Sequence, residues 1–133
     1  MGKAKFTFEY EINASRKMLY PYLSSASGLA QWFADDVTVN EDKVFNFIYD
    51  DTDHYAKLTI QRLNNLVRFD FLKENGLSET DIDADYIEFK LETNELTQTT
   101  FLKITEFADF ESPEEQEEVW THMLNTLKEI VGG

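Results

Sequence analysis

The chain has 133 residues and no Cys, and its 26 acidic side chains outnumber its 12 Lys and Arg, giving a formal net charge of −14. Disulfides and thiolate chemistry are therefore excluded, and such a charge is repelled by nucleic-acid phosphates and anionic membranes. Hydrophobic residues make up 42% of the sequence, which suits a single domain over residues 1–133. With no signal peptide, no membrane-spanning run and no Cys, we expect a cytoplasmic protein with no nucleic-acid partner and no membrane insertion.

The N-terminal third is predicted to form one strand and two short helices. Residues 4–12 alternate apolar and polar, which is the period of a strand with one buried face. Ser15 begins a short helix that runs to about Leu23, and Ser25 or Ser27 begins a second that ends near residue 33. The side chains expected to face inward from these helices are Met18, Leu19, Tyr22, Leu29, Trp32 and Phe33.

Six further strands with polar turns between them are expected before the last helix. They are residues 37–39, 44–49, 55–62, 67–71, 87–91 and 97–107, and residues 73–83 form the longest expected loop. In the third of these, Ala56, Leu58 and Ile60 are expected to point inward. Short connections make neighbouring strands antiparallel.

The last stretch, residues 113–131, is predicted to be a long amphipathic helix. Ser112 is a natural N-cap, Pro113 suits the first helical position and Gly132 ends the helix. The apolar stripe consists of Val119, Trp120, Met123, Leu124, Leu127, Ile130 and Val131. The opposite, polar face carries Glu115, Gln116, Glu118, His122, Asn125 and Lys128. We therefore predict an α+β fold in which a curved antiparallel sheet of about six to seven strands wraps around this helix.

This order of elements resembles the START-like superfamily, also called the helix-grip or birch-pollen-allergen-like fold. Residues 15–39, SRKMLYPYLSSASGLAQWFADDVTV, are similar to the branch named for an activator of the heat-shock-protein-90 ATPase, with Trp32-Phe33 at the Trp position. A second match is the aromatic-then-Leu pattern that begins at Trp120 in the last helix. The resemblance implies the helix-grip fold, with two short helices between strands 1 and 2.

Patterns for metal binding and catalysis are weak. His54 is expected in a solvated turn after Asp53, and His122 on an exposed helix face four residues after Glu118. No Ser, His and acid set can be assembled, so the sequence favours a non-enzymatic domain without a cofactor. The carboxylates with the spacing of a calcium loop are Asp81, Asp83, Asp85 and Glu92. Tyr86 stands where such a loop requires Gly, so we expect no metal.

A set of large apolar side chains supplies the candidate ligand-binding residues. They are expected between the sheet and the last helix, where they either fill the core or line an apolar cavity. The candidates are Trp32, Phe33, Phe47, Tyr55, Phe69, Phe89, Trp120, Met123 and Leu127.

Three functions are compatible with the sequence. The first is a non-enzymatic domain that binds an apolar small molecule or lipid in the cavity between the sheet and the C-terminal helix. The second, implied by the resemblance, is a protein-interaction module whose acidic face binds a basic protein surface or a chaperone. The third is a cyclase- or hydrolase-like enzyme using the same cavity, which a carboxylate with a raised pKa inside that cavity would favour.

Overall fold

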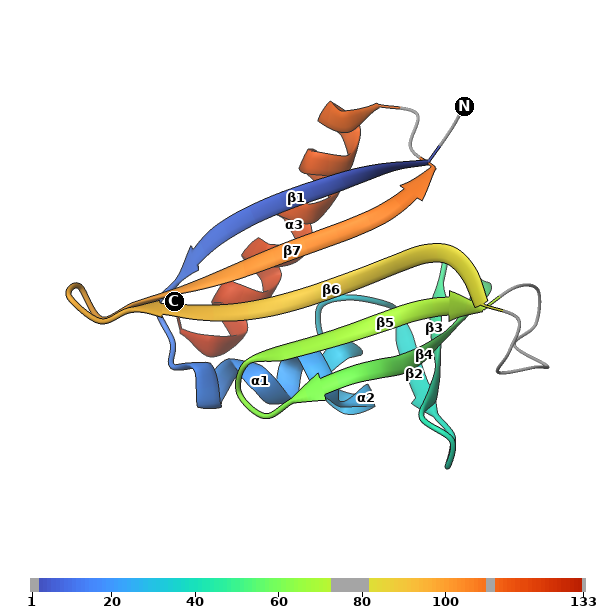
Figure 1. Ribbon diagram of the computed structural model, residues 1–133, viewed down its shortest axis with the longest axis horizontal. Helices are drawn as coiled ribbons and strands as arrows, with labels where there is room; N and C mark the ends of the chain where they lie inside the picture. Colours follow the sequence, from blue (N-terminus) through green and yellow to red (C-terminus); the bar gives the residue numbers. More distant parts are fainter. Residues whose placement is uncertain (1–2, 73–81, 110–111, 133) are drawn as a thin grey trace.

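The computed structural model describes residues 3–72, 82–109 and 112–132, and these form one seven-stranded sheet and three helices. The strands are β1 (Lys3–Ile12), β2 (Asp36–Val39), β3 (Val44–Tyr49), β4 (Thr52–Arg62), β5 (Leu66–Leu72), β6 (Ile82–Asn94) and β7 (Thr99–Asp109). All pair antiparallel in the order β1-β7-β6-β5-β4-β3-β2. The helices are α1 (Arg16–Ser24), α2 (Ala26–Leu29) and α3 (Pro113–Val131). The sheet is curved and the three helices lie on its concave side (Figure 1), so the predicted α+β helix-grip architecture is confirmed.

Helix α3 has the bounds that its capping residues predict. The Ser112 hydroxyl accepts a hydrogen bond from the Glu115 amide, and Gly132 adopts a left-handed conformation with φ 82° that ends the helix. The buried side of α3 is narrower than the predicted stripe. Val119, assigned to that stripe, is 50% exposed, whereas Gln116, assigned to the polar face, is half-buried.

The three fully buried side chains of α3 explain this difference. Trp120, Leu124 and Leu127 define the line that faces the sheet. Gln116 lies one turn before Trp120 on that line, and Val119 lies at its margin. None of the three described helices has the length and apolarity needed to span a bilayer.

A layer of aromatic rings fills the middle of the space between the sheet and α3. Phe33 is at its centre, with its ring centroid 5.8 Å from Trp120, 5.0 Å from Phe47 and 5.9 Å from Phe89. Phe69 extends the layer, 5.3 Å from Phe47. Each such pair contributes about 0.5–1.5 kcal/mol beyond its buried area. The layer divides the interior, so any hollow lies toward an end of the sheet.

The two short helices are capped as predicted, and α2 buries Leu29 as expected, but α1 exposes a different side. The Ser15 and Ser25 hydroxyls accept hydrogen bonds from the first turns of α1 and α2. The buried side chains of α1 are Leu19, Tyr20 and Leu23. Met18, predicted to face inward, is 52% exposed, and Tyr22 is half-buried. The buried face of α1 is shifted by one residue from the predicted face, which is a rotation of about 100° on a helix with 3.6 residues per turn. In the observed orientation Leu23 is also buried.

Strand β4 ends at Arg62 as predicted, but it begins earlier than predicted and its register shifts before that end. It begins at Thr52, so His54 lies within the strand, not in a solvated turn, and its ring stacks on Tyr49 at 3.8 Å. A β-bulge between Leu58 and Ile60 shifts the register, which places Ile60 opposite Arg68 and not on the inward face. Most of the predicted loop 73–83 lies outside the described residues, and β6 begins at Ile82.

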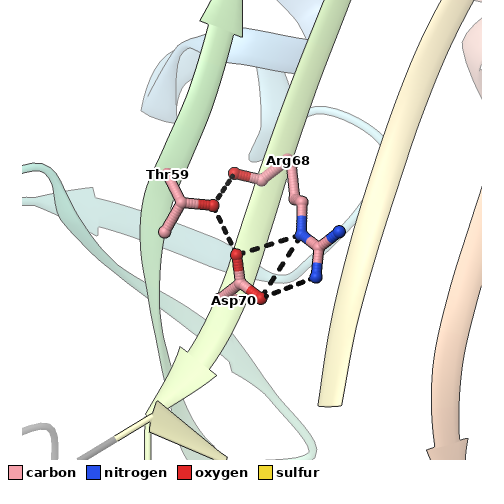
Figure 2. Close-up of polar contacts among 3 residues, drawn as sticks. All are labelled: Thr59, Arg68 and Asp70. Carbon is pink, nitrogen blue, oxygen red and sulfur yellow. Dashed lines mark hydrogen bonds and ion pairs between the residues drawn. The ribbon is translucent and has the colours of Figure 1, made fainter. Parts of the chain in front are cut away.

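The convex face of the sheet carries a polar cluster where β4 meets β5 (Figure 2). The Arg68 guanidinium donates to both carboxylate oxygens of Asp70, with Nε 3.1 Å from Oδ2 and Nη2 3.1 Å from Oδ1. The Thr59 hydroxyl donates to the same carboxylate. The guanidinium also lies 3.8 Å from the centroid of the Tyr86 ring on β6. These contacts bind three neighbouring strands to one another on the side away from the helices.

Candidate functional site

A cavity of about 440 Å³ lies between the first half of α3 and the end of β7. Its apolar wall consists of Phe33, Ile87, Ala108, Val119, Trp120 and Met123. Its polar groups are Tyr49, Glu106, Asp109 and Gln116. Val119 and Tyr49 are 50% and 38% exposed, so the cavity reaches the surface beside them. The aromatic layer closes its inner end through Phe33 and Trp120.

Glu106 is the polar centre of this cavity, and the strand register explains its position. Leu102 and Ile104 are buried on the concave face of β7, and Glu106 follows them at the same strand period. Its neighbours across the sheet are Phe6 on β1 and Ile87 on β6. A carboxylate therefore takes the next inward position after two fully buried aliphatic residues.

Two donors from α3 hold one oxygen of this carboxylate. Trp120 Nε1 donates to Glu106 Oε1 at 2.9 Å, and Gln116 Nε2 donates to the same oxygen at 2.7 Å. Gln116 and Trp120 are four residues apart and so lie on the same side of the helix. Hydrogen bonds to a charged acceptor are about twice as strong as neutral ones, so this arrangement fixes both the carboxylate and the helix.

Burial is the largest influence on the pKa values of two groups in the cavity, Glu106 and Tyr49. It raises the pKa of Glu106 above its ordinary value of 4.5, and nearby Asp85 adds to the rise, while the bonds from Trp120 and Gln116 oppose it. Burial likewise raises the pKa of Tyr49 to about 12, with smaller contributions from Glu106 and Asp50. The phenol of Tyr49 therefore stays neutral at physiological pH and keeps its proton as a possible donor.

A smaller hollow of about 270 Å³ adjoins the first and shares Tyr49, Ile87, Glu106 and Ala108 with it. It adds the imidazole of His54, whose Nδ1 lies 3.2 Å from the Phe47 carbonyl oxygen. Because a carbonyl only accepts, this contact places a proton on Nδ1. Within the described residues, no three His, Cys, Asp or Glu side chains are grouped to hold a metal ion.

A larger hollow, about 640 Å³, lies at the other end of the molecule, around the start of α1 and the β6–β7 turn. Its wall is mostly polar and includes exposed side chains such as Lys17 and Gln98. Ligand sites bury most of their ligand against apolar side chains, and this hollow has two in its lining, Ile12 and Ala14. The cavity beside Trp120 is therefore the better candidate.

The structure brings only part of the predicted ligand-binding set to this cavity. Phe33, Trp120 and Met123 line it, and Tyr55 lines the adjoining hollow. The others lie in the packed core and line neither hollow: Trp32, Phe47, Phe69, Phe89 and Leu127. The role of each in ligand binding stays a prediction.

Sequence reasoning missed the polar half of the site. The available signal was Glu106 in phase with Leu102 and Ile104, since an acid at an inward strand position is unusual. A second signal was Gln116 four residues before the buried Trp120. A third signal was Tyr49, which alternates with Phe45 and Phe47 along β3 and lines the cavity.

Comparison with known proteins places the chain in a family. The family model of the START-like superfamily domain matches residues 1–133, and the chain belongs to this superfamily, as its sequence resemblance predicted. No curated protein matches the sequence.

Solved structures share the fold. An Aha1 protein of Colwellia psychrerythraea, solved as a dimer, has 21% identity and a TM-score of 0.72 over 96% of each chain. The Bacteroides fragilis protein BfR322 has 31% identity and a TM-score of 0.61 over 98% of this chain and 92% of that one. Protein MLL2253 of Mesorhizobium loti has 12% identity and a TM-score of 0.73 over 97% of each chain.

Proposed function

We propose that this START-like domain binds an apolar small molecule or lipid, without chemical conversion, in the cavity between the sheet and α3. The observation that supports the proposal is the hollow of about 440 Å³ beside Trp120, lined by six apolar side chains. Ligand sites typically measure about 300–1,000 Å³ and combine an apolar wall with a few polar groups. Glu106, Gln116 and Tyr49 are the polar groups here.

The aromatic layer limits what this cavity accepts. Phe33 and Trp120 close its inner end, and the rings behind them are in contact with one another. A ligand therefore enters beside Val119 and occupies one end of the interior. Its binding free energy comes mainly from the apolar area it buries, at about 25 cal/mol per Å².

A solvatochromic dye and native mass spectrometry test this proposal. The dye should bind with a blue-shifted emission, and Val119→Trp should abolish binding because an indole at that exposed position fills the mouth. Leu63→Trp is the matched control, since Leu63 is 78% exposed on the β4–β5 connection, away from the cavity. Unchanged dye binding in Val119→Trp, or no dye or lipid uptake by the wild type, would contradict the proposal.

A second candidate function is protein interaction. The net charge of −14 favours a basic partner surface, and a protein of the same fold, the Colwellia Aha1, is solved as a dimer. The absence of Cys supports the cytoplasmic location that we propose with it. A pull-down at low and high salt tests this function: a chaperone or other basic protein should bind at low salt and dissociate at high salt. Failure to retain one at low salt would remove this candidate.

A third candidate is an enzyme that uses Glu106 as general base. The raised pKa of this buried carboxylate is the observation that favours it. Incubation with a cell extract, followed by mass spectrometry of the molecules bound or released, tests this candidate. Conversion by the wild type and not by Glu106→Gln would support it, and identical product profiles would exclude a role for Glu106.

A further inference from the structure

We infer that the cavity selects an amphiphile whose head group is a hydrogen-bond donor, best a cation such as a primary ammonium, and that this head binds Glu106 Oε2. The inference rests on the proposed ligand-binding function and adds the chemical class of the ligand. It follows from the geometry of one carboxylate and from the charges around it.

The two oxygens of Glu106 have different surroundings. Oε1 accepts hydrogen bonds from both Trp120 Nε1 and Gln116 Nε2. No described residue donates a hydrogen bond to Oε2, although the side chain lines both hollows. Because Oε1 is occupied by two donors, a proton taken up by Glu106 binds Oε2. Oε2 is thus the atom that offers a free acceptor to a ligand when the carboxylate is ionised.

The charges around the two hollows favour a positive head group. Among the described residues that line them, the acids are Asp53, Asp85, Glu106 and Asp109, and none is Lys or Arg. Lys3 reaches Asp85 from the edge strand and pairs with it at 2.5 Å, so Asp85 is compensated within the protein. Tyr49, whose pKa is raised, stays neutral and adds no charge to the hollows. An anionic head, such as that of a fatty acid, would meet like charge next to Glu106, and the described lining of the two hollows offers it no Lys or Arg, only the imidazole of His54.

The apolar wall of the cavity suits the apolar part of the ligand. Ile87, Ala108 and Met123 line the same cavity as Glu106 and suit a hydrocarbon chain or a ring. A ligand with a donor at one end and an apolar body would thus satisfy Oε2 and bury apolar area at once. A purely apolar ligand would cover Oε2 and leave it without a partner, which is costly in a desolvated site.

Three probes that share one dodecyl chain separate the head group from the chain. Dodecylammonium, dodecanol and dodecanoate are titrated below their aggregation concentrations by calorimetry at neutral pH. We expect the affinity order ammonium, then alcohol, then carboxylate. Glu106→Gln should weaken ammonium binding by about tenfold or more, the range of a lost charge-assisted hydrogen bond, and change dodecanol binding by less than about threefold.

A matched variant controls for net charge. Glu88 is on β6 beside Ile87, but it faces the convex side opposite Arg68, so Glu88→Gln removes one negative charge without touching the cavity. It should leave all three affinities unchanged. If Glu88→Gln weakened ammonium binding as much as Glu106→Gln, the effect would be general attraction to an acidic protein, and the inference would fail.

The two Trp side chains provide a readout that needs no mutation. Trp120 Nε1–H is bonded to Glu106, whereas Trp32 Nε1–H is bonded to the Tyr22 carbonyl oxygen at 2.8 Å. In a ¹⁵N-labelled protein, dodecylammonium should shift the Trp120 indole signal strongly and the Trp32 signal little. A shift of neither signal on ammonium binding would overturn the inference.

The outcomes distinguish this inference from the function on which it rests. If none of the three probes binds the wild type, the ligand-binding proposal itself is wrong. If the probes bind and Val119→Trp blocks them, but dodecanoate binds as tightly as dodecylammonium or Glu106→Gln binds like the wild type, only the head-group inference is overturned.

Discussion

Trp120 Nε1 lies 2.9 Å from Glu106 Oε1, so a fully buried indole on α3 donates to a carboxylate on the inward face of β7. The contact links two segments that are 14 residues apart, across the connection from the sheet to the last helix. Apolar packing alone tolerates sliding of a helix along a sheet, but a hydrogen bond between two fixed atoms does not. The polar contact therefore sets the register of α3 on the sheet and leaves one carboxylate oxygen toward the cavity.

Replacing each Trp by Phe should separate this contact from ordinary burial. Trp120→Phe removes a hydrogen bond to a charged group and should lower the free energy of unfolding by about 1.5–3 kcal/mol. Trp32→Phe removes a neutral bond to the Tyr22 carbonyl and should cost about 0.5–1.5 kcal/mol. The volume change is the same in both variants, so urea denaturation measures the difference. Equal losses would mean that the Glu106 contact adds nothing beyond packing.

The stability of the protein should depend on pH through Glu106. Burial raises the pKa of the folded-state carboxyl above 4.5, so at pH values just above 4.5 the folded state holds a proton that the unfolded chain has released. In that window the folded state binds more protons, and stability falls as pH rises through the folded pKa. Glu106→Gln lacks this titration, so its stability relative to wild type should rise across the window and level off above it.

Urea denaturation over a pH series measures this difference directly. Glu88→Gln, which removes an acid from the convex face of the same sheet, controls for the change in net charge. A Glu106→Gln difference that is constant with pH would contradict the assigned burial of the carboxylate. The same titration, followed through the Trp120 indole signal, should give the folded-state pKa of Glu106.

How much the sequence predicts differs between the fold and the site. Alternation in residues 4–12 and the 3.6-residue period of residues 113–131 predict the elements because both depend on local repeats. Two of the mispredicted positions, Ile60 and His54 on β4, depend on contacts with neighbouring strands and not on the local sequence pattern. The register shift at the bulge places Ile60 on the same face of the sheet as Arg68. His54 stacks on Tyr49 of the neighbouring strand, and β4 begins before it, at Thr52.

The sequence predicts where a cavity would lie, between the sheet and α3, but it leaves open whether side chains fill that space, and it does not identify Glu106 and Gln116 as its polar groups. Whether large rings fill a gap depends on how Phe33 and Trp120 pack across elements that are far apart in sequence. Glu106 breaks an apolar pattern at one position, and its partners Gln116 and Trp120 belong to a different element. Chain periodicity specifies which face a residue occupies, whereas pairing between elements specifies what it meets there.

Gly28 marks the closest approach of the two short helices. A Cβ at this position would lie 2.2 Å from the Pro21 carbonyl oxygen and 2.7 Å from the Tyr22 Cα, both backbone atoms of α1. Gly28→Ala should therefore force α1 and α2 apart and lower the free energy of unfolding by about 1–3 kcal/mol. Ser27→Ala, at the exposed neighbouring position, should change it by less than about 0.5 kcal/mol. Since Ala is the better helix former, a stabilised Gly28→Ala would show that the helices are not in this contact.

The convex cluster in Figure 2 should contribute modestly to stability and nothing to ligand binding. The side chains of Arg68 and Asp70 are 30% and 13% exposed, so solvent screens their ion pair only in part. Arg68→Met should lower the free energy of unfolding by about 1 kcal/mol in low salt and by less in 1 M salt. Arg68→Lys keeps the charge but loses the paired hydrogen bonds and the flat contact with Tyr86, so its loss should approach that of Arg68→Met. Urea denaturation at both salt concentrations gives these values. Full stability in Arg68→Lys would show that charge, and not the geometry of the guanidinium, holds the cluster together. Weaker binding of the dodecyl probes to either variant would mean that the convex face of the sheet is coupled to the cavity on its concave face.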